Sequence, residues 1–243
     1  MSDGVFDEDV ARSYDADIEH MYAPEVLIPT VDVLSKLSSG GSALEFAIGT
    51  GRVAVPLARR GVHVEGIELS AAMADVLRER EGGETINVVI GDMATTTVPG
   101  AFDLVYLVFN TIGNLTSQDQ QTACFVNAAR HLKRGGRFVI EVGVPALRRL
   151  PPGERFVTFS MSHHYIGVDE YDLVTQSLVS HHLNVDDEGR ARSFRTPQRY
   201  VWPAELDLMA QISGMRLESR WESWDKTAFT HESEHHVSVW IKP

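Results

Sequence analysis

Short apolar runs and helix-like stretches alternate through the N-terminal part of the chain. Apolar residues at Val31, Leu34 and Leu37 have helical spacing, which predicts a helix with Pro29 in its first turn and Gly40 and Gly41 at its end. Five apolar runs follow, at residues 42–48, 63–69, 86–92, 102–109 and 137–144. Helical stretches separate these runs, and this order predicts a parallel sheet covered by helices on both faces.

Capping residues place two of the helices between the strands. Ser70 is typical of an N-cap and predicts a helix over residues 71–81. Ser117 and Gln120 form a capping-box pattern ahead of a second helical stretch, which Gly135 is expected to end.

The pattern becomes β-rich from about Arg155. Runs at 155–167, 170–185 and 192–202, with turn residues at 186–189, predict an antiparallel meander. Pro203 then begins one more helix, which ends near Gly214, and two final strands follow. We therefore predict a core formed by residues 1–150 and 203–243, with a β-rich insertion at 151–202. Within the core, residues 5–22 are expected to form a short surface helix or a flap.

Composition limits the class of protein. The chain has 243 residues, of which 43% are hydrophobic, enough for one sizeable core. Its 22 basic and 34 acidic residues give a net charge of -12 without a basic cluster, which disfavours a nucleic-acid partner.

The cysteine content and the N-terminal sequence predict a cytoplasmic protein. Cys124 is the single cysteine, so an internal disulfide is excluded and a reducing compartment is favoured. The acidic N-terminus does not resemble a signal peptide, and no run approaches the roughly 20 apolar residues that cross a bilayer. We expect a soluble cytoplasmic protein without a membrane partner. The oligomeric state stays open, with a homodimer as one option.

A glycine-containing turn between a predicted strand and a predicted helix indicates a nucleotide site. Gly49, Gly51 and Ala54 match the dinucleotide fingerprint G-x-G-x-x-G/A, which brings backbone N–H groups and a helix N-terminus against a ligand. This pattern alone fits a nicotinamide cofactor as well as another cofactor that contains adenosine.

Four features outside the glycines bear on the choice of cofactor, although an acid at Glu68 suits a nicotinamide site as well. Glu45 precedes the turn within its strand, Glu68 ends the second strand, and Asp92 with Met93 follows the third. The chain then closes with a helix and two strands. Together these features resemble the class I S-adenosylmethionine-dependent methyltransferases over about residues 40–145, with Ala47 where that family has its first glycine.

The resemblance implies a Rossmann-like seven-stranded α/β fold with an antiparallel terminal strand and S-adenosylmethionine as the cofactor. It implies that Glu68 binds the ribose and Asp92 the adenine amine, and Tyr14 is similar to a tyrosine of a flap over the cofactor. The cofactor residues implied are Tyr14, Glu45, Ala47, Gly49, Gly51, Glu68, Leu69, Met73, Asp92, Met93 and Phe109.

The insertion is similar to that of small-molecule enzymes such as sugar N-methyltransferases and glycine N-methyltransferase. We therefore expect methyl transfer by in-line displacement to a nitrogen or oxygen of a small-molecule acceptor, with S-adenosylhomocysteine as product. The candidate acceptor-binding residues are Asn110, in the loop after the fourth strand, and Tyr165, Arg195, Arg199, Tyr200 and Trp202 in the insertion. Each of them also has a structural interpretation, as a loop cap or a packing residue.

Two histidine pairs in the insertion are candidates for a general base. Histidine suits this role near neutral pH. The pairs are His163 with His164 and His181 with His182. Neighbours in a strand point to opposite faces, so one member of each pair is expected to face the acceptor, and the sequence does not say which.

The segment HESEHH at 231–236 does not have the spacing of a helical zinc motif, so we interpret it as a solvated acidic turn and predict no metal. Two alternatives to a methyltransferase stay open. One is an NAD(P)-dependent oxidoreductase, which Glu45, Asp92 and the lack of a Tyr-x-x-x-Lys pair disfavour. The other is a non-catalytic module that binds S-adenosylmethionine.

Overall fold

A seven-stranded mixed sheet organises the larger part of the computed structural model, which describes residues 8–243. Its strand order is β10-β11-β5-β4-β1-β2-β3, and only the pairs on either side of β11 are antiparallel. The strands are β1 (Ser42–Phe46), β2 (His63–Glu68), β3 (Asn87–Ile90), β4 (Phe102–Leu107), β5 (Leu132–Gly143), β10 (Arg216–Trp221) and β11 (His235–Ile241). The predicted α/β fold class with an antiparallel terminal strand is confirmed.

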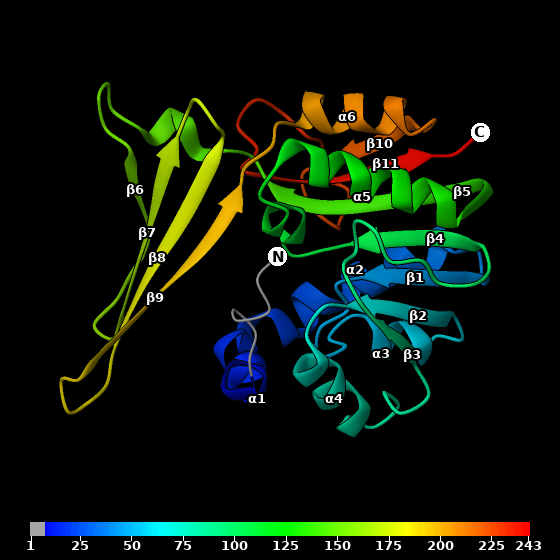
Figure 1. Cartoon of the computed structure of the whole chain (residues 1–243), viewed down its shortest axis with the longest axis horizontal. Coiled ribbons are helices and arrows are strands. Elements are labelled where there is room, and N and C mark those ends of the chain that lie inside the picture. The colour runs from blue at the N-terminus through cyan, green and yellow to red at the C-terminus, as the bar shows by residue number, and fades with distance from the viewer. Residues whose placement is uncertain (1–7) are drawn as a thin grey trace.

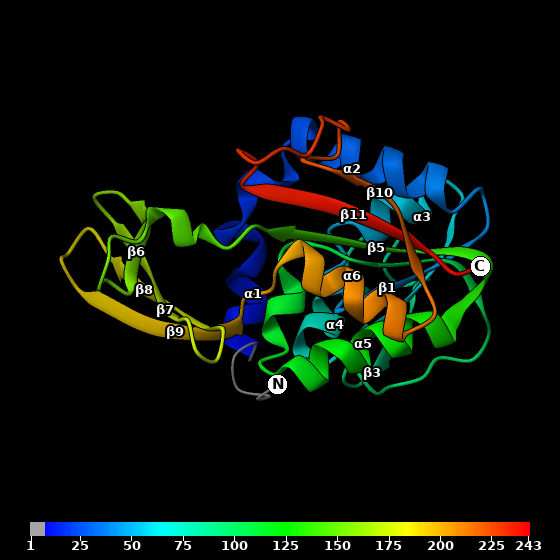
Figure 2. The ribbon, with the colours of Figure 1, turned by 90° about the horizontal axis from the view of Figure 1, so that it is seen from above.

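Helices cover both faces of this sheet (Figures 1 and 2), so each face has its own apolar core. Phe125, Phe138 and Trp240 form an edge-to-face aromatic cluster in one core, and Leu34 and Tyr106 are fully buried in the other. The helices are α1 (Glu8–Asp17), η1 (Glu19–Tyr22), α2 (Pro24–Leu37), α3 (Ala54–Ala58), α4 (Ala71–Glu79), η2 (Thr111–Asn114), α5 (Gln118–His131), η3 (Ala146–Arg149) and α6 (Pro203–Ile212).

Two helix boundaries differ from the predicted ones. Helix α2 begins at Pro24, so Pro29 lies inside the helix and not in its first turn. Helix α5 ends at His131, before Gly135, because the chain there pairs with the C-terminus. Lys242 donates through Nζ to the carbonyl oxygens of Ala129 and Leu132, and its carbonyl oxygen accepts from Gly135 N. A lysine thus satisfies the free carbonyl groups at the helix end.

The insertion after β5 forms a separate antiparallel sheet of order β6-β7-β8-β9 that projects from the core (Figure 1). Its strands are β6 (Phe156–Met161), β7 (Tyr165–Asp172), β8 (Ser177–Val185) and β9 (Ala191–Arg199). The turn predicted at 186–189 joins β8 to β9. Two further turns, at 162–164 and 173–176, divide the predicted runs and were not expected. The domain boundaries near residues 150 and 203 stay predictions.

Helix α1 accounts for most of the predicted 5–22 segment, whose first residues lie outside the described part of the chain. No helix within residues 8–243 is long and apolar enough to span a membrane. Within the same residues, no three side chains of His, Cys, Asp or Glu are grouped as metal ligands would be.

Candidate active site

The turn after β1 is held in a left-handed conformation that brings its backbone to the carboxyl edge of the sheet. The φ angles are +51° at Ala47, +58° at Gly49 and +80° at Gly51. A Cβ at Gly51 would lie 3.0 Å from two side-chain carbons of Leu77, and one at Gly49 would lie 3.6 Å from Cε of Met73. Glycine is therefore required at Gly51 by both conformation and space.

Ala47 occupies a conformation that favours glycine, which explains why the family has glycine there. We expect Ala47→Gly to stabilise the protein by up to about 1 kcal/mol. The backbone strain of a left-handed alanine costs more free energy than the extra chain entropy of glycine in the unfolded state. Thermal unfolding monitored by circular dichroism measures this change. An unchanged or lower Tm would contradict the assigned backbone strain.

Glu68 ends β2 with its carboxylate turned toward the glycine turn. Its Oε2 accepts from Gly49 N at 2.8 Å and its Oε1 accepts from Ser70 N at 2.9 Å. Burial raises the pKa of Glu68, and the backbone N–H groups oppose that rise. Each carboxylate oxygen keeps a further lone pair, so the group can still accept from ligand hydroxyls. Leu69 follows it, half-buried.

Asp92 lies at the end of the next strand, β3. Its Oδ1 accepts from Ala94 N at 2.7 Å, and no residue among 8–243 donates to its Oδ2. Met93 beside it is fully buried, and Asn127 of α5 fixes this loop by donating to Met93 O at 2.9 Å. Asp92 thus offers one unbonded carboxylate oxygen two strands away from the glycine turn.

Glu45 is buried within β1, ahead of the glycine turn. The hydroxyl of Tyr106 donates to its Oε2 at 2.8 Å. Burial raises the pKa of Glu45 to about 8, against the lowering effects of Tyr106 and Arg52. The carboxyl is therefore largely protonated at neutral pH, and its contact with a cofactor stays a prediction.

Arg52 is a site residue that the sequence analysis did not select. It follows Gly51, is 8% exposed, and lies with its guanidinium carbon 5.4 Å from the centre of the Phe109 ring. Its charge also acts on Tyr14 of α1, whose pKa burial raises to about 12. The charge of Glu68 acts on Tyr14 as well, and the role of Tyr14 in a flap over the cofactor stays a prediction.

A polar cluster, defined here as Asp15, Tyr22, Thr50 and Arg80, fastens α1 to this turn. Asp15 Oδ1 accepts from Tyr22 and Thr50 hydroxyls, each at 2.6 Å, and Asp15 Oδ2 accepts from Arg80 of the α4 C-terminus. Arg80 also donates to the Tyr22 hydroxyl at 3.0 Å. The cluster therefore holds α1 against the turn at Thr50 and the end of α4.

We expect Arg80→Met to speed dissociation of S-adenosylhomocysteine about tenfold. The variant removes a charge-assisted hydrogen bond of about 1.5 kcal/mol between α1 and the end of α4, which helps to hold α1 against the glycine turn. Stopped-flow fluorescence measures the rate, and Arg78→Met is the matched control, since Arg78 forms its ion pair with the exposed Asp75 on the same helix. Equal rates in the wild type and Arg80→Met would contradict the assigned role.

The loop after β4 is strained and closely fixed. Phe109 and Asn110 have φ angles of +59° and +62°, an uncommon conformation for residues with side chains. Glu141 of β5 accepts from Phe109 N at 3.0 Å and from Nε1 of Trp224 at 2.8 Å. Asn110 Oδ1 accepts from Gly143 N at 2.7 Å. Asn110 is thereby held at the carboxyl edge, beside the ends of β4 and β5.

The two faces of the second sheet differ in what they contact. Gln198 approaches Gly113 of η2, and the apolar cluster that includes Tyr171 packs with Leu147 of η3. Their shared face is therefore the one turned toward the loops after β4 and β5. We call it the inner face. It also carries His182, whose Nδ1 lies 2.7 Å from the Tyr165 hydroxyl, and whose pKa burial lowers.

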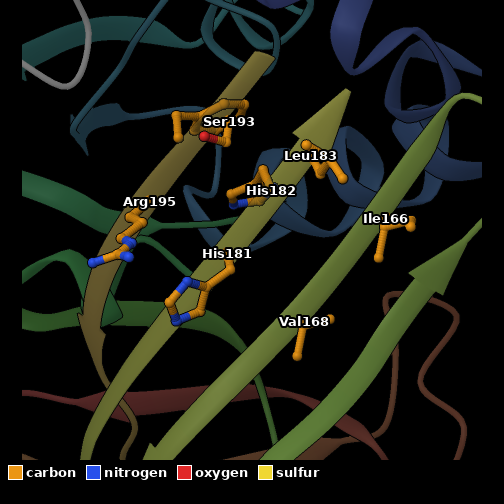
Figure 3. A pocket seen from close by; sticks show the side chains of 8 residues that line it. Ile166, Val168, His181, His182, Leu183, Ser193 and Arg195 are labelled. Carbon is orange, nitrogen blue, oxygen red and sulfur yellow. The ribbon is translucent and has the colours of Figure 1, made fainter. Parts of the chain in front are cut away.

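The outer face carries a shallow hollow of about 600 Å³ (Figure 3). It is lined by outward-facing side chains, and also by His182 and Phe194, whose strand positions point to the inner face; the outward-facing residues are Ile166, Val168, His181, Leu183, Ser193 and Arg195. His181 lies 3.1 Å from Glu170 of the neighbouring strand. Strand alternation thus separates His181 from His182, as predicted for neighbours in a strand.

The first histidine pair does not lie in a strand. His163 and His164 form the exposed turn between β6 and β7, because the chain reverses at Ser162, and the two rings lie side by side with centroids 4.6 Å apart. The expectation that strand alternation separates them is therefore wrong. The general-base roles of all four histidines stay predictions.

The remaining candidates lie at the base of the second sheet or on its strands. Arg199 is buried and donates to Gln121 of α5 and Glu205 of α6, so its guanidinium joins the sheet to the core. Tyr200 is buried against Tyr171, whereas Trp202 is 39% exposed at the start of α6. The predicted acceptor-binding roles are not tested by these contacts and stay predictions for Tyr165, Arg195, Arg199, Tyr200 and Trp202.

Comparison with known proteins identifies the family. The CcbJ methyltransferase from Streptomyces caelestis has a structure that is 34% identical to this chain, with a TM-score of 0.80 over 88% of each chain. The chain belongs to the class I S-adenosylmethionine-dependent methyltransferases. The family described as "Methyltransferase domain" matches residues 43–136.

Two further relatives extend this finding. The cypemycin N-terminal methyltransferase of a Streptomyces species is 27% identical over 226 residues, which is 89% of each chain. The structure of CalS10 with bound cofactor, an amino pentose methyltransferase from Micromonospora echinaspora, is 21% identical with a TM-score of 0.70 and covers 89% of this chain and 91% of its own. The methyltransferase thus shares its fold with CcbJ and CalS10 over nearly nine tenths of its length.

Proposed function

We propose that this methyltransferase transfers the methyl group of S-adenosylmethionine to an amine nitrogen of a small molecule or a peptide terminus. The observation that carries the proposal is the row of polar groups along one edge of the sheet. Asp92, Glu68 and the glycine turn end β3, β2 and β1, and Asn110 follows β4 next in line. Ligands of open α/β sheets lie along this edge.

The residues of this row fit the parts of the cofactor. Asp92 Oδ2 is open to the adenine amine, and the remaining lone pairs of Glu68 suit the ribose hydroxyls. The backbone at Gly49 and Gly51 leaves room for the methionine part, and Arg52 supplies the cation for its carboxylate. Tyr14 and the α1 helix close over this end and exclude water.

The bound cofactor supplies an activated methyl group on a positively charged sulfur. The protein's contribution is then to align an acceptor lone pair with that methyl group, and such orientation can contribute up to about 7 to 11 kcal/mol. The fixed loop at Phe109 and Asn110 is suited to this task, because Glu141 and Gly143 hold it rigidly.

Two observations favour nitrogen over oxygen as the acceptor atom. The net charge of -12 attracts a positively charged amine more than a neutral alcohol. The relative that aligns with 89% of this chain is named for methylation at a peptide N-terminus.

A paired acceptor panel tests the proposal. The full-length protein and S-adenosylmethionine are incubated with three amines, triglycine, glucosamine and phenethylamine, and with N-acetyl-triglycine, glucose and 2-phenylethanol as their matched controls. Mass spectrometry then locates added methyl groups. We expect methylation of amines only. Methylation of the hydroxyl compounds, or cofactor binding with no methylated amine, would contradict the proposal.

A further inference from the structure

His235 lies at the same edge as the acceptor loop, although it belongs to the last strand of the sheet. Strand β11 runs antiparallel to β5, beside which it lies in Figure 2, and His235 pairs with Gly143 at the β5 end. The first residue of β11 therefore lies at the carboxyl edge of the parallel strands. The HESEHH segment that precedes and begins β11 thus reaches the candidate active site.

Three hydrogen-bond acceptors converge beside Gly143. The position that a Cβ of Gly143 would take is 3.5 Å from Asn110 Oδ1, 3.7 Å from Glu234 O and 3.8 Å from His235 Nδ1. We call this place the Gly143 niche. Each of the two oxygens already accepts one backbone N–H, from Gly143 and Val144, and keeps a second lone pair. The His235 ring forms no hydrogen bond with the described residues 8–243 and is exposed.

The niche lies on the acceptor side of the proposed cofactor. Arg52, assigned above to the methionine end, packs on Phe109, and Asn110 is the next residue. Strands in a sheet are about 4.8 Å apart, so β11 lies about 10 Å along the edge from β4. An acceptor above β4 and β5 is therefore within reach of both Asn110 and His235.

We propose that His235 is a catalytic base that deprotonates an acceptor ammonium in the Gly143 niche. This inference rests on the proposed amine methylation. The proton moves from the ammonium nitrogen to Nδ1, the imidazole becomes imidazolium, and the amine gains the lone pair that it needs for attack. The free amine then turns so that this lone pair points from His235 toward the methyl group, and Asn110 Oδ1 accepts one of its two remaining N–H bonds.

The niche also defines the class of acceptor. Three hydrogen-bond acceptors at one place are matched by a ligand nitrogen that carries several N–H bonds, as a primary ammonium does. A hydroxyl group carries one hydrogen and can donate to only one of these three hydrogen-bond acceptors. The assigned substrate class is therefore a primary amine or a protonated secondary amine.

The test uses three variants of the full-length protein with triglycine, glucosamine and phenethylamine as probes. His235→Ala removes the base, and Gly143→Ala fills the niche without strain, since its Cβ would make ordinary contacts of 3.5 Å or more. His231→Ala is the matched control, because His231 is an exposed histidine of the same segment with its ring beside Glu232. Calorimetry with S-adenosylhomocysteine reports on folding and cofactor binding.

We expect His235→Ala to lower kcat at least about 100-fold, the usual contribution of a general base, with the Kd for S-adenosylhomocysteine unchanged. Added imidazole is expected to restore part of that rate, which a purely structural role would not allow. Gly143→Ala should raise the KM for the amine about tenfold, whereas His231→Ala should match the wild type.

Each contrary outcome has a distinct meaning. If His235→Ala methylates amines at the wild-type rate, or if imidazole does not restore the lost rate, the role of His235 is overturned. The proposed amine methylation is unaffected by either result. If Gly143→Ala keeps the wild-type kcat and the wild-type KM for the amine, the assignment of the Gly143 niche as the amine site is overturned. No amine turnover by the wild type would overturn the proposed function and this inference with it.

Discussion

Replacing Glu68 with alanine is expected to weaken S-adenosylhomocysteine binding about 100-fold. The carboxylate would accept both ribose hydroxyls, and hydrogen bonds to a charged group contribute about 1.5 kcal/mol or more each, so two lost bonds amount to about 3 kcal/mol. The variant also frees Gly49 N and Ser70 N, which loosens the glycine turn. Isothermal titration calorimetry measures the change in Kd.

Glu65→Ala is the matched control for this effect. Glu65 lies on the same strand, but its carboxylate contacts His63 and Asn87 away from the glycine turn. Its loss should leave the Kd within about twofold of the wild-type value. Similar binding by Glu68→Ala and the wild type would place the ribose elsewhere.

The second large effect is expected for Gly51→Ala, which should abolish cofactor binding and destabilise the protein by about 2 kcal/mol. The new methyl group meets Leu77 at 3.0 Å, and alanine at a φ of +80° is strained in addition. Chemical denaturation and calorimetry measure the two losses.

Gly61→Ala separates the two causes. Gly61 has a φ of +84° but no heavy atom within 4 Å of its Cβ position, so alanine there experiences only the backbone strain, about 1 kcal/mol. It should bind the cofactor normally. Equal destabilisation by the two substitutions would show that packing against Leu77 does not matter.

The core of the fold and the cofactor end of the site could be predicted from the sequence, because local patterns determine both. Apolar runs separated by helices imply parallel strands, and the ends of such strands carry Gly49, Glu68 and Asp92 to one edge. The second sheet was harder to divide. The turn at 173–176 contains Leu173 and Val174, which read as strand residues but are 61% and 93% exposed.

The acceptor end of the site depends on contacts between distant parts of the chain. Arg52 reads as a surface residue, and it is buried because Phe109 and η1 contact its guanidinium. His235 reads as part of a solvated turn, and only the pairing of β11 with β5 brings it beside Asn110. Pairing of this kind leaves no local signal, so sequence reasoning found neither residue.

A crystal structure with S-adenosylhomocysteine tests the central claim most directly, because it shows whether methyl donor and acceptor niche face each other. Our account predicts the adenine amine at Asp92, the ribose on Glu68, and the sulfur directed toward Asn110 and the Gly143 niche. A ligand whose sulfur points away from that niche, or one bound in the hollow of the second sheet, would contradict it.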